Sequence, residues 1–216
     1  MSDADTVTVD AHKQLQCPIG TGALLLKDPL DPARVAKAAE YIIREDSWDQ
    51  GRFTLEGSRP AMALYVHLNF CCQGREGMAA PVRRGHALAK QFARMIQDRE
   101  DFELILEPET NIILYRYVPP AWVGADLAAA GPDMDAVQAR VQALQLADGR
   151  TFTSRTRVHV PRYGERLVCL RAVLGNDQIT AQSLGAVLAR QAALGAAALS
   201  APAPGEGLLS SSQFSN

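Results

Sequence analysis

The chain has 216 residues, 47% of them hydrophobic, which suits one large domain or two small ones with a sizeable buried core. Its formal net charge of -2 comes from interspersed charges, and the sequence has neither a basic block nor a basic amphipathic stripe, so we expect no nucleic-acid or membrane-surface partner. No apolar run is long enough to span a bilayer.

A short strand followed by a histidine–lysine pair opens the chain. Residues 6–9 alternate threonine and valine, which are strand formers, and the polar residues Asp10 to Lys13 follow. In an open α/β sheet, ligands bind outside the carboxyl ends of the strands. A lysine there can form an imine with an aldehyde cofactor, and the adjacent His12 would suit a phosphate. The alternative is a surface lysine, because charged side chains are mostly exposed.

A second strand, a helix and a loop are expected next. The apolar run 23–27 lies between glycine and an aspartate–proline pair, which predicts a buried strand. Asp31 is expected to cap a helix with Pro32 in its first position, and the helix should end near Glu45. The polar residues 46–57 are expected to form a loop.

Two helices should follow, one from Arg59–Pro60 to just before Gly74 and one from about Gly77 to Asp98. Apolar residues recur in both at helical spacing. They are Met62, Leu64, Tyr65, Leu68 and Cys72 in the first helix, and Leu88, Phe92, Met95 and Ile96 in the second. His67 and His86 lie in these helices without a partner at metal-ligand spacing, so neither is expected to bind a metal.

The remainder of the chain predicts an antiparallel sheet with helices on it. Strands are expected at residues 102–106, 111–118, 152–160 and 166–174, each bounded by turn residues. Asp133 should cap a helix that ends at Asp148–Gly149, and a last helix should begin within residues 176–180 and end near Ala198. This order is typical of an α+β layer. Residues 201–216 are expected to be a disordered tail.

The cysteines and the N-terminus bear on the setting of the protein. Cys17, Cys71, Cys72 and Cys169 lack metal-ligand and disulfide-framework spacing, so we expect free thiols and no metal site. The N-terminus is acidic and polar, unlike a signal peptide. A reduced, cytoplasmic setting is therefore expected.

Four segments, taken in order, resemble the group II pyridoxal-phosphate-dependent decarboxylases, which include the glutamate, aspartate and aromatic amino acid decarboxylases. They are residues 9–29, 41–45, 51–60 and 111–119, and the resemblance covers about the first 200 residues. The bacterial glutamate/aspartate decarboxylase-like branch is the most similar. The resemblance implies an α/β fold class, the C-terminal part of a fold type I enzyme. Residues 1–76 would then be the end of the large cofactor-binding domain with its connecting helix, and residues 77–200 the small α+β C-terminal domain.

The resemblance also implies roles for single residues. Lys13 would be the catalytic lysine, forming an imine with pyridoxal 5'-phosphate, and His12 would contact the cofactor phosphate. Arg171 would bind a substrate carboxylate through a two-pronged hydrogen bond, and an edge-strand arginine in water is the alternative. Arg59 also matches the family, although a surface ion pair is favoured for it. Asp10 departs from the asparagine common in the aromatic branch, and a phosphate would repel it.

In the resembled family the larger part of the catalytic domain precedes the lysine strand, and this chain begins just before that strand. We therefore expect a truncated or split decarboxylase of an amino acid, glutamate or aspartate by branch. Its protein partner would be a second copy in a homodimer or a missing N-terminal half. The family's lid tyrosine has no match between Asp46 and Arg59. Trp48 is an alternative lid residue there, although a packed aromatic is favoured for it. The competing hypothesis is an inactive remnant or interaction subunit that keeps the small-domain fold.

Overall fold

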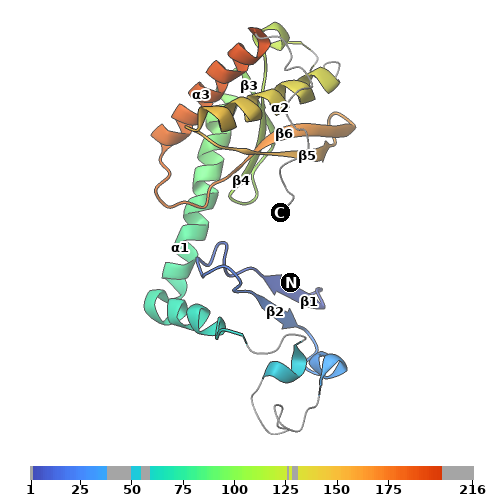
Figure 1. Ribbon diagram of the computed structural model, residues 1–216, viewed down its shortest axis with the longest axis vertical. Helices are drawn as coiled ribbons and strands as arrows, with labels where there is room; N and C mark the ends of the chain where they lie inside the picture. Colours follow the sequence, from blue (N-terminus) through green and yellow to red (C-terminus); the bar gives the residue numbers. More distant parts are fainter. Residues whose placement is uncertain (1, 38–49, 55–58, 126, 128–130, 201–216) are drawn as a thin grey trace, which may run out of the picture. The chain divides into compact units, whose positions relative to one another are not determined.

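The computed structural model describes residues 2–37, 50–54, 59–125, 127 and 131–200. It divides into two compact units, residues 1–82 and 83–216, and each is described by itself. Figure 1 labels the helices and strands. The expected tail, residues 201–216, lies outside the described part, and separate folding of residues 77–200 stays a prediction.

The first unit contains the two expected strands, paired antiparallel. β1 (Thr6–Val9) and β2 (Ala23–Leu26) pair from Thr6 opposite Leu26 to Val9 opposite Ala23. The prediction that the second strand is buried is wrong, since Leu24 and Leu25 are 60% and 55% exposed. An apolar run shows that a strand can be buried, but it does not determine what covers the strand. The antiparallel pairing also places Lys13 in a loop between two neighbouring strands, rather than at the edge of a parallel sheet.

Two 3-10 turns replace the expected helix and part of the expected loop. η1 spans Asp31–Val35 with Leu30 as N-cap, so Asp31 lies in the first turn and does not cap it. The side chain of Asp28 accepts a hydrogen bond from the Leu30 amide at 2.8 Å, which fixes this start one residue earlier than expected. η2 spans Gln50–Phe53, inside the predicted loop. Residues 38–49, with Trp48, and 55–58 lie outside the described part.

The two helices expected after residue 59 are confirmed, joined end to end. α1 (Ala63–Gln97) contains one non-helical residue, Gly74, with φ 63° and ψ -179°. Glycine adopts that left-handed conformation without the steric cost of a Cβ, so the chain bends there and continues directly as the second helix. The first segment begins at Ala63 and the second follows Gly74, a few residues from the predicted starts.

The second unit is the expected α+β layer. Its strands are β3 (Phe102–Leu106), β4 (Ile112–Tyr117), β5 (Ser154–Val160) and β6 (Glu165–Val173), in the antiparallel order β3-β4-β6-β5. The turn η3 (Pro120–Trp122) follows β4. The helices α2 (Gly131–Asp148) and α3 (Ala181–Ser200) complete the unit. Asp133 is in the first turn of α2 and is not its cap, because the helix begins at Gly131.

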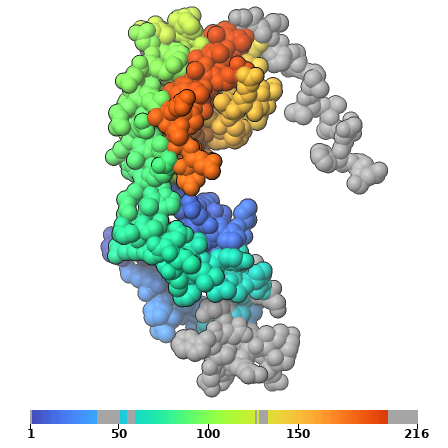
Figure 2. All heavy atoms as spheres, turned by 90° about the vertical axis from the view of Figure 1, so that its left-hand side faces the viewer, coloured from blue at the N-terminus to red at the C-terminus, as the bar shows by residue number. Residues whose placement is uncertain are grey.

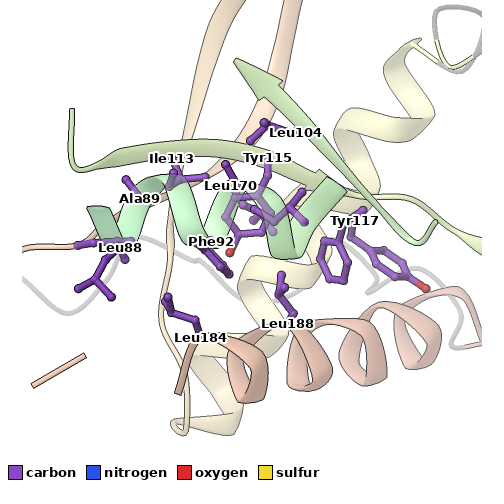
Figure 3. Packing of buried hydrophobic residues seen from close by; sticks show 14 of the residues in the cluster. Leu88, Ala89, Phe92, Leu104, Ile113, Tyr115, Tyr117, Leu170, Leu184 and Leu188 are labelled. Carbon is purple, nitrogen blue, oxygen red and sulfur yellow. The ribbon is translucent and has the colours of Figure 1, made fainter. Parts of the chain in front are cut away.

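One face of this sheet packs against three helical segments, which are α2, α3 and the C-terminal part of α1. Side chains from α1 and α3 meet β4 and β6 in Figure 3, and the aromatic rings of Phe92 and Tyr115 lie edge to face with centroids 5.4 Å apart. Such a pair adds about 0.5–1.5 kcal/mol to the free energy of burial alone. The buried members of this core include Leu88, Phe92, Ile96, Phe102, Leu104, Ile113, Tyr115, Tyr117, Val141, Leu170, Leu184 and Leu188.

Buried glutamines join the helices to the sheet. Gln138 of α2 accepts a hydrogen bond from the Tyr117 amide and donates one to the Tyr117 carbonyl, each at 2.8 Å, so its side-chain amide takes the place of a strand partner. Gln191 of α3 accepts a hydrogen bond from the Tyr115 hydroxyl at 2.9 Å. Buried polar groups are costly unless paired, so these bonds fix how the helices sit on β4.

The close approach of α3 to Tyr117 predicts the effect of a glycine substitution. A Cβ at Gly195 would overlap the Tyr117 ring, whereas at Gly185 of the same helix it would make an ordinary contact of 3.5 Å with Met95. Gly195→Ala should therefore lower the free energy of unfolding by about 1–3 kcal/mol through overpacking. Gly185→Ala, the matched control, should leave it unchanged or raise it. Thermal denaturation measures both, and equal midpoints for the two variants would contradict the packing described.

Candidate functional site

Lys13 lies in a compact loop, residues 10–22, that we call the lysine loop. Its ends are held together because Val9, before it, pairs with Ala23, after it. Inside it, the Cys17 amide donates to the Ala11 carbonyl at 3.1 Å, and the His12 amide donates to the Thr21 carbonyl at 3.2 Å. A loop of this length with adjoining ends is an Ω-loop, a class that is frequently functional.

The Lys13 ammonium is accessible and paired with Asp10. Lys13 Nζ lies 2.6 Å from Asp10 Oδ2, and the two side chains are 66% and 43% exposed. The hydrogen bond from Lys13, followed by its positive charge, lowers the pKa of Asp10 below the ordinary value of 3.8. Exposed pairs contribute little to stability, so Lys13 can leave Asp10 readily. An exposed amine is compatible with both the catalytic and the surface-lysine hypotheses, and the role of Lys13 stays a prediction.

His12 is half-buried, and its ring is oriented by the loop. Nδ1 lies 3.2 Å from the Thr21 carbonyl oxygen. A carbonyl oxygen only accepts, so Nδ1 carries the hydrogen and Nε2 remains available to a ligand. Thr21 itself is 1% exposed, and its hydroxyl has no hydrogen-bond partner in the described part of the chain. The sequence interpretation missed Thr21, because nothing in the Gly-Thr-Gly pattern marks a buried hydroxyl.

Arg171 lies on the face of the second unit's sheet opposite the three helices. On β6, Leu170 packs into the helix-side core, whereas Leu167 and Cys169 belong to a second cluster on the other face. Alternation along the strand places Arg171 with Leu167 and Cys169. The strand lies between β4 and β5, which makes the edge-strand alternative wrong. Arg171 is half-buried, and within the described residues its side chain has no hydrogen bond or ion pair.

A charge cluster occupies the same sheet face. Arg116 is fully buried and pairs with Glu103, which also accepts hydrogen bonds from Arg162 at 2.5 Å and from the Tyr163 hydroxyl. The Arg116 guanidinium lies 4.9 Å from the Tyr163 ring centroid. Burial raises the pKa of the nearby Cys169 thiol to about 11 and keeps it protonated. The cluster fixes the β5–β6 turn, and the sequence interpretation did not identify it.

The remaining predicted residues are described unit by unit. Arg59 is exposed and precedes α1 in an irregular stretch. Lys13 and His12 are neighbours in the first unit, and Arg171 is in the second.

Among the described residues, no three His, Cys, Asp or Glu side chains gather as a metal site. A search of the same residues finds no helix of the length and apolarity that crossing a membrane requires.

Comparisons with known proteins identify relatives of most of the chain. The family model described as the pyridoxal-dependent decarboxylase conserved domain matches residues 1–118. The chain is 40% identical over 197 residues to the aspartate 1-decarboxylase of Aliivibrio fischeri, covering 87% of this chain and 36% of that protein. It is 31% identical over 125 residues to an acidic amino acid decarboxylase of Mus musculus, covering 55% of this chain and 23% of that one.

Solved structures show the same fold. The crystal structure of mouse CSAD in apo form covers 89% of this chain with a TM-score of 0.77 at 23% identity, and 40% of its own chain is matched. The structure of Oryza sativa TDC with PLP and tryptamine covers 89% with a TM-score of 0.74 at 16% identity, over 39% of its chain. The chain thus spans well under half the length of the relatives it matches.

The Asp10–Lys13 pair predicts a measurable titration. In an NMR titration, the Asp10 carboxyl should titrate below 3.8, and Lys13→Met should return its pKa toward that value. Because the folded-state pKa is lowered, the pair's small contribution to stability exists above the ordinary pKa and is lost as the pH falls through the lowered one. Lys27→Met, which removes a lysine outside the loop, should change nothing. An Asp10 carboxyl that titrates at or above 3.8 in the unsubstituted chain would exclude the pair.

Proposed function

The chain belongs to the family of group II pyridoxal-phosphate-dependent decarboxylases, and from that membership we propose that it forms part of an enzyme that decarboxylates an acidic amino acid. Lys13 would be the residue that holds the cofactor covalently. The observation that carries the proposal is the lysine loop, where an accessible amine adjoins a half-buried, oriented imidazole. The loop belongs to the segment, residues 1–118, that matches the family model.

The residues of the lysine loop fit pyridoxal phosphate. The cofactor has an aldehyde, which needs an amine, and a phosphate, which needs hydrogen-bond donors or cations. Lys13 offers the amine, and His12 offers Nε2, which donates a hydrogen bond when the imidazole is protonated. Thr21 adds a buried hydroxyl without a partner in the described residues, next to the carbonyl that orients His12. When bound, the cofactor would supply an electron sink for the electron pair that remains when a carboxylate leaves as carbon dioxide.

The chain's own residues then have separate tasks. Lys13 would leave Asp10, release a proton to solvent so that its amine can act as a nucleophile, and later return a proton toward the substrate carbon. His12 Nε2 would hold the phosphate. Arg171 would bind a substrate carboxylate with both arms of its guanidinium. The two parallel hydrogen bonds would hold the carboxylate in one orientation. Support for this last task comes from its half-buried place on an inner strand and the lack of an acceptor among the described residues.

The names of two relatives support an acidic amino acid as the proposed substrate. Proteins named aspartate 1-decarboxylase and acidic amino acid decarboxylase are 40% and 31% identical to the matched parts of this chain. We therefore favour aspartate or glutamate as the substrate. The matches cover 36% and 23% of those proteins. We propose that further polypeptide, in the same chain or in a separate partner chain, completes the site, and that a second copy in a homodimer is the alternative partner. A cytoplasmic setting is part of the proposal.

Covalent labelling tests the role of Lys13. Residues 1–216 are joined to the part of the Aliivibrio fischeri aspartate 1-decarboxylase that the match does not cover, and the product is incubated with pyridoxal phosphate. Visible absorbance should appear, and borohydride should leave a stable pyridoxyl adduct that mass spectrometry maps to Lys13. Lys13→Ala should abolish the adduct, and Lys13→Arg should not restore it, because a guanidinium is not a usable nucleophile.

Lys27→Ala is the matched control and should keep the adduct. An adduct on Lys27, Lys37 or Lys90 would refute the assignment. An adduct on Lys13 without release of carbon dioxide from aspartate or glutamate would instead favour the inactive remnant or interaction subunit. The unjoined 216-residue chain should bind the cofactor weakly and show no turnover.

Substrate kinetics test Arg171 in the same joined protein. Arg171→Ala should weaken substrate binding by about 2–5 kcal/mol, at least about thirtyfold, if the guanidinium pairs with a buried carboxylate. The Lys13 adduct should form normally. Arg155→Ala is the matched control. Arg155 of β5 lies opposite Leu170 of β6, so its side chain is on the sheet face that Arg171 does not share. An unchanged KM in Arg171→Ala would exclude the carboxylate role.

A further inference from the structure

The lysine loop contains a backbone conformation that needs support. Gln16 has a φ of 55°, a left-handed backbone conformation that is unfavourable for residues other than glycine. The turn around it is connected to the lysine itself, since the Gln16 amide donates to the Lys13 carbonyl at 3.2 Å. If Gln16 leaves this conformation, the Lys13 carbonyl loses its hydrogen bond from the Gln16 amide. Groups that stabilise the Gln16 turn therefore also hold Lys13.

One side chain from α1 contacts both residues that flank Gln16. Asn69 Nδ2 donates to the Leu15 carbonyl at 3.3 Å and to Cys17 Sγ at 3.4 Å. The Cys17 thiol in turn lies 3.6 Å from the same Leu15 carbonyl. The three atoms form a closed set of contacts around the left-handed residue. Cys17 is only 6% exposed, so these contacts are largely shielded from water.

Asn69 is half-buried in a helical segment, residues 63–74, in which no residue is buried, so its contacts serve the loop more than a core. Its neighbours on α1, Leu68 and Phe70, are 47% and 46% exposed, and this first segment of the helix lies on the surface in Figure 2. Asparagine is also a poor residue for a helix interior, because its amide competes with the backbone for hydrogen bonds. Here the side-chain amide of Asn69 instead donates hydrogen bonds outside the helix, to Leu15 and Cys17 of the lysine loop.

We propose that Asn69 is a positioning residue for the cofactor-binding lysine, acting through the Gln16 turn. The inference rests on the proposed function of Lys13 and adds a residue 56 positions away in the sequence. Asn69 does not touch the reacting atoms. It restricts the Leu15–Cys17 segment, so that a larger fraction of molecules present Lys13 in one orientation.

The first test needs no cofactor. Trypsin can cleave after Lys13 only when the lysine loop opens, and cleavage after Arg34, outside the loop, is an internal reference. Asn69→Ala and the isosteric Asn69→Asp, which lacks the donor, should speed cleavage after Lys13 about fivefold, the effect of one lost hydrogen bond. Asn69→Gln keeps the donor and should stay near the parent, as should the control Phe70→Ala. Equal acceleration at Lys13 and Arg34, or a large fall in thermal midpoint, would indicate a general structural role and overturn the proposal.

The second test uses the joined protein described above and measures the dissociation constant of pyridoxal phosphate from visible absorbance. Asn69→Ala should raise it about fivefold, and Gln16→Gly should shrink this effect, because glycine adopts the left-handed conformation without help. An unchanged dissociation constant in Asn69→Ala, with the adduct still on Lys13, would overturn the positioning role alone. Loop-specific tryptic acceleration together with an adduct on another lysine would overturn the proposed function and leave the structural link between Asn69 and the loop supported.

Discussion

The candidate site depends on the antiparallel pairing of β1 with β2. Because Val9 lies opposite Ala23, the thirteen residues of the lysine loop begin and end side by side. Further into the loop, the hydrogen bond from the His12 amide to the Thr21 carbonyl also holds the two sides of the loop together. Closing a loop costs conformational entropy, and here the strand pairing supplies the compensating bonds. Without it, Lys13 and the imidazole beside it would sample many orientations.

In the second unit, the alternation of side chains along β6 determines which sheet face Arg171 occupies. Leu170 points to the helices and completes the core with Tyr115 and Phe92, so Arg171 must point to the other face. That face is not a generic polar surface, since Cys169 and Arg116 are fully buried there. A cation placed among buried groups attracts a carboxylate more strongly than one in water, because the local dielectric is lower.

The sequence predicts local features well and distant partners poorly. The four strands of the second unit lie within two residues of their expected bounds, because alternation and turn residues are local signals. The exposure of Leu24 and Leu25 could not be predicted, because it depends on what packs over β2. Lys13 and His12 were proposed as site residues from their place after a strand and from the family resemblance, and their roles stay predictions. Asn69 was not, since an asparagine in a helix does not reveal that its partner is Leu15, 54 residues away.

The lysine loop and the strand that carries Arg171 are rigid for different reasons. The lysine loop is held by a few hydrogen bonds between polar groups, several of them half-exposed, so single contacts such as that of Asn69 have a large share in its order. Arg171 is held by a sheet whose other face is a hydrophobic core, so its backbone position is as stable as the unit itself. Under the proposed function, a loop that exchanges Lys13 between Asp10 and the cofactor benefits from weak, separable contacts. An arginine that binds a substrate carboxylate benefits instead from a fixed strand.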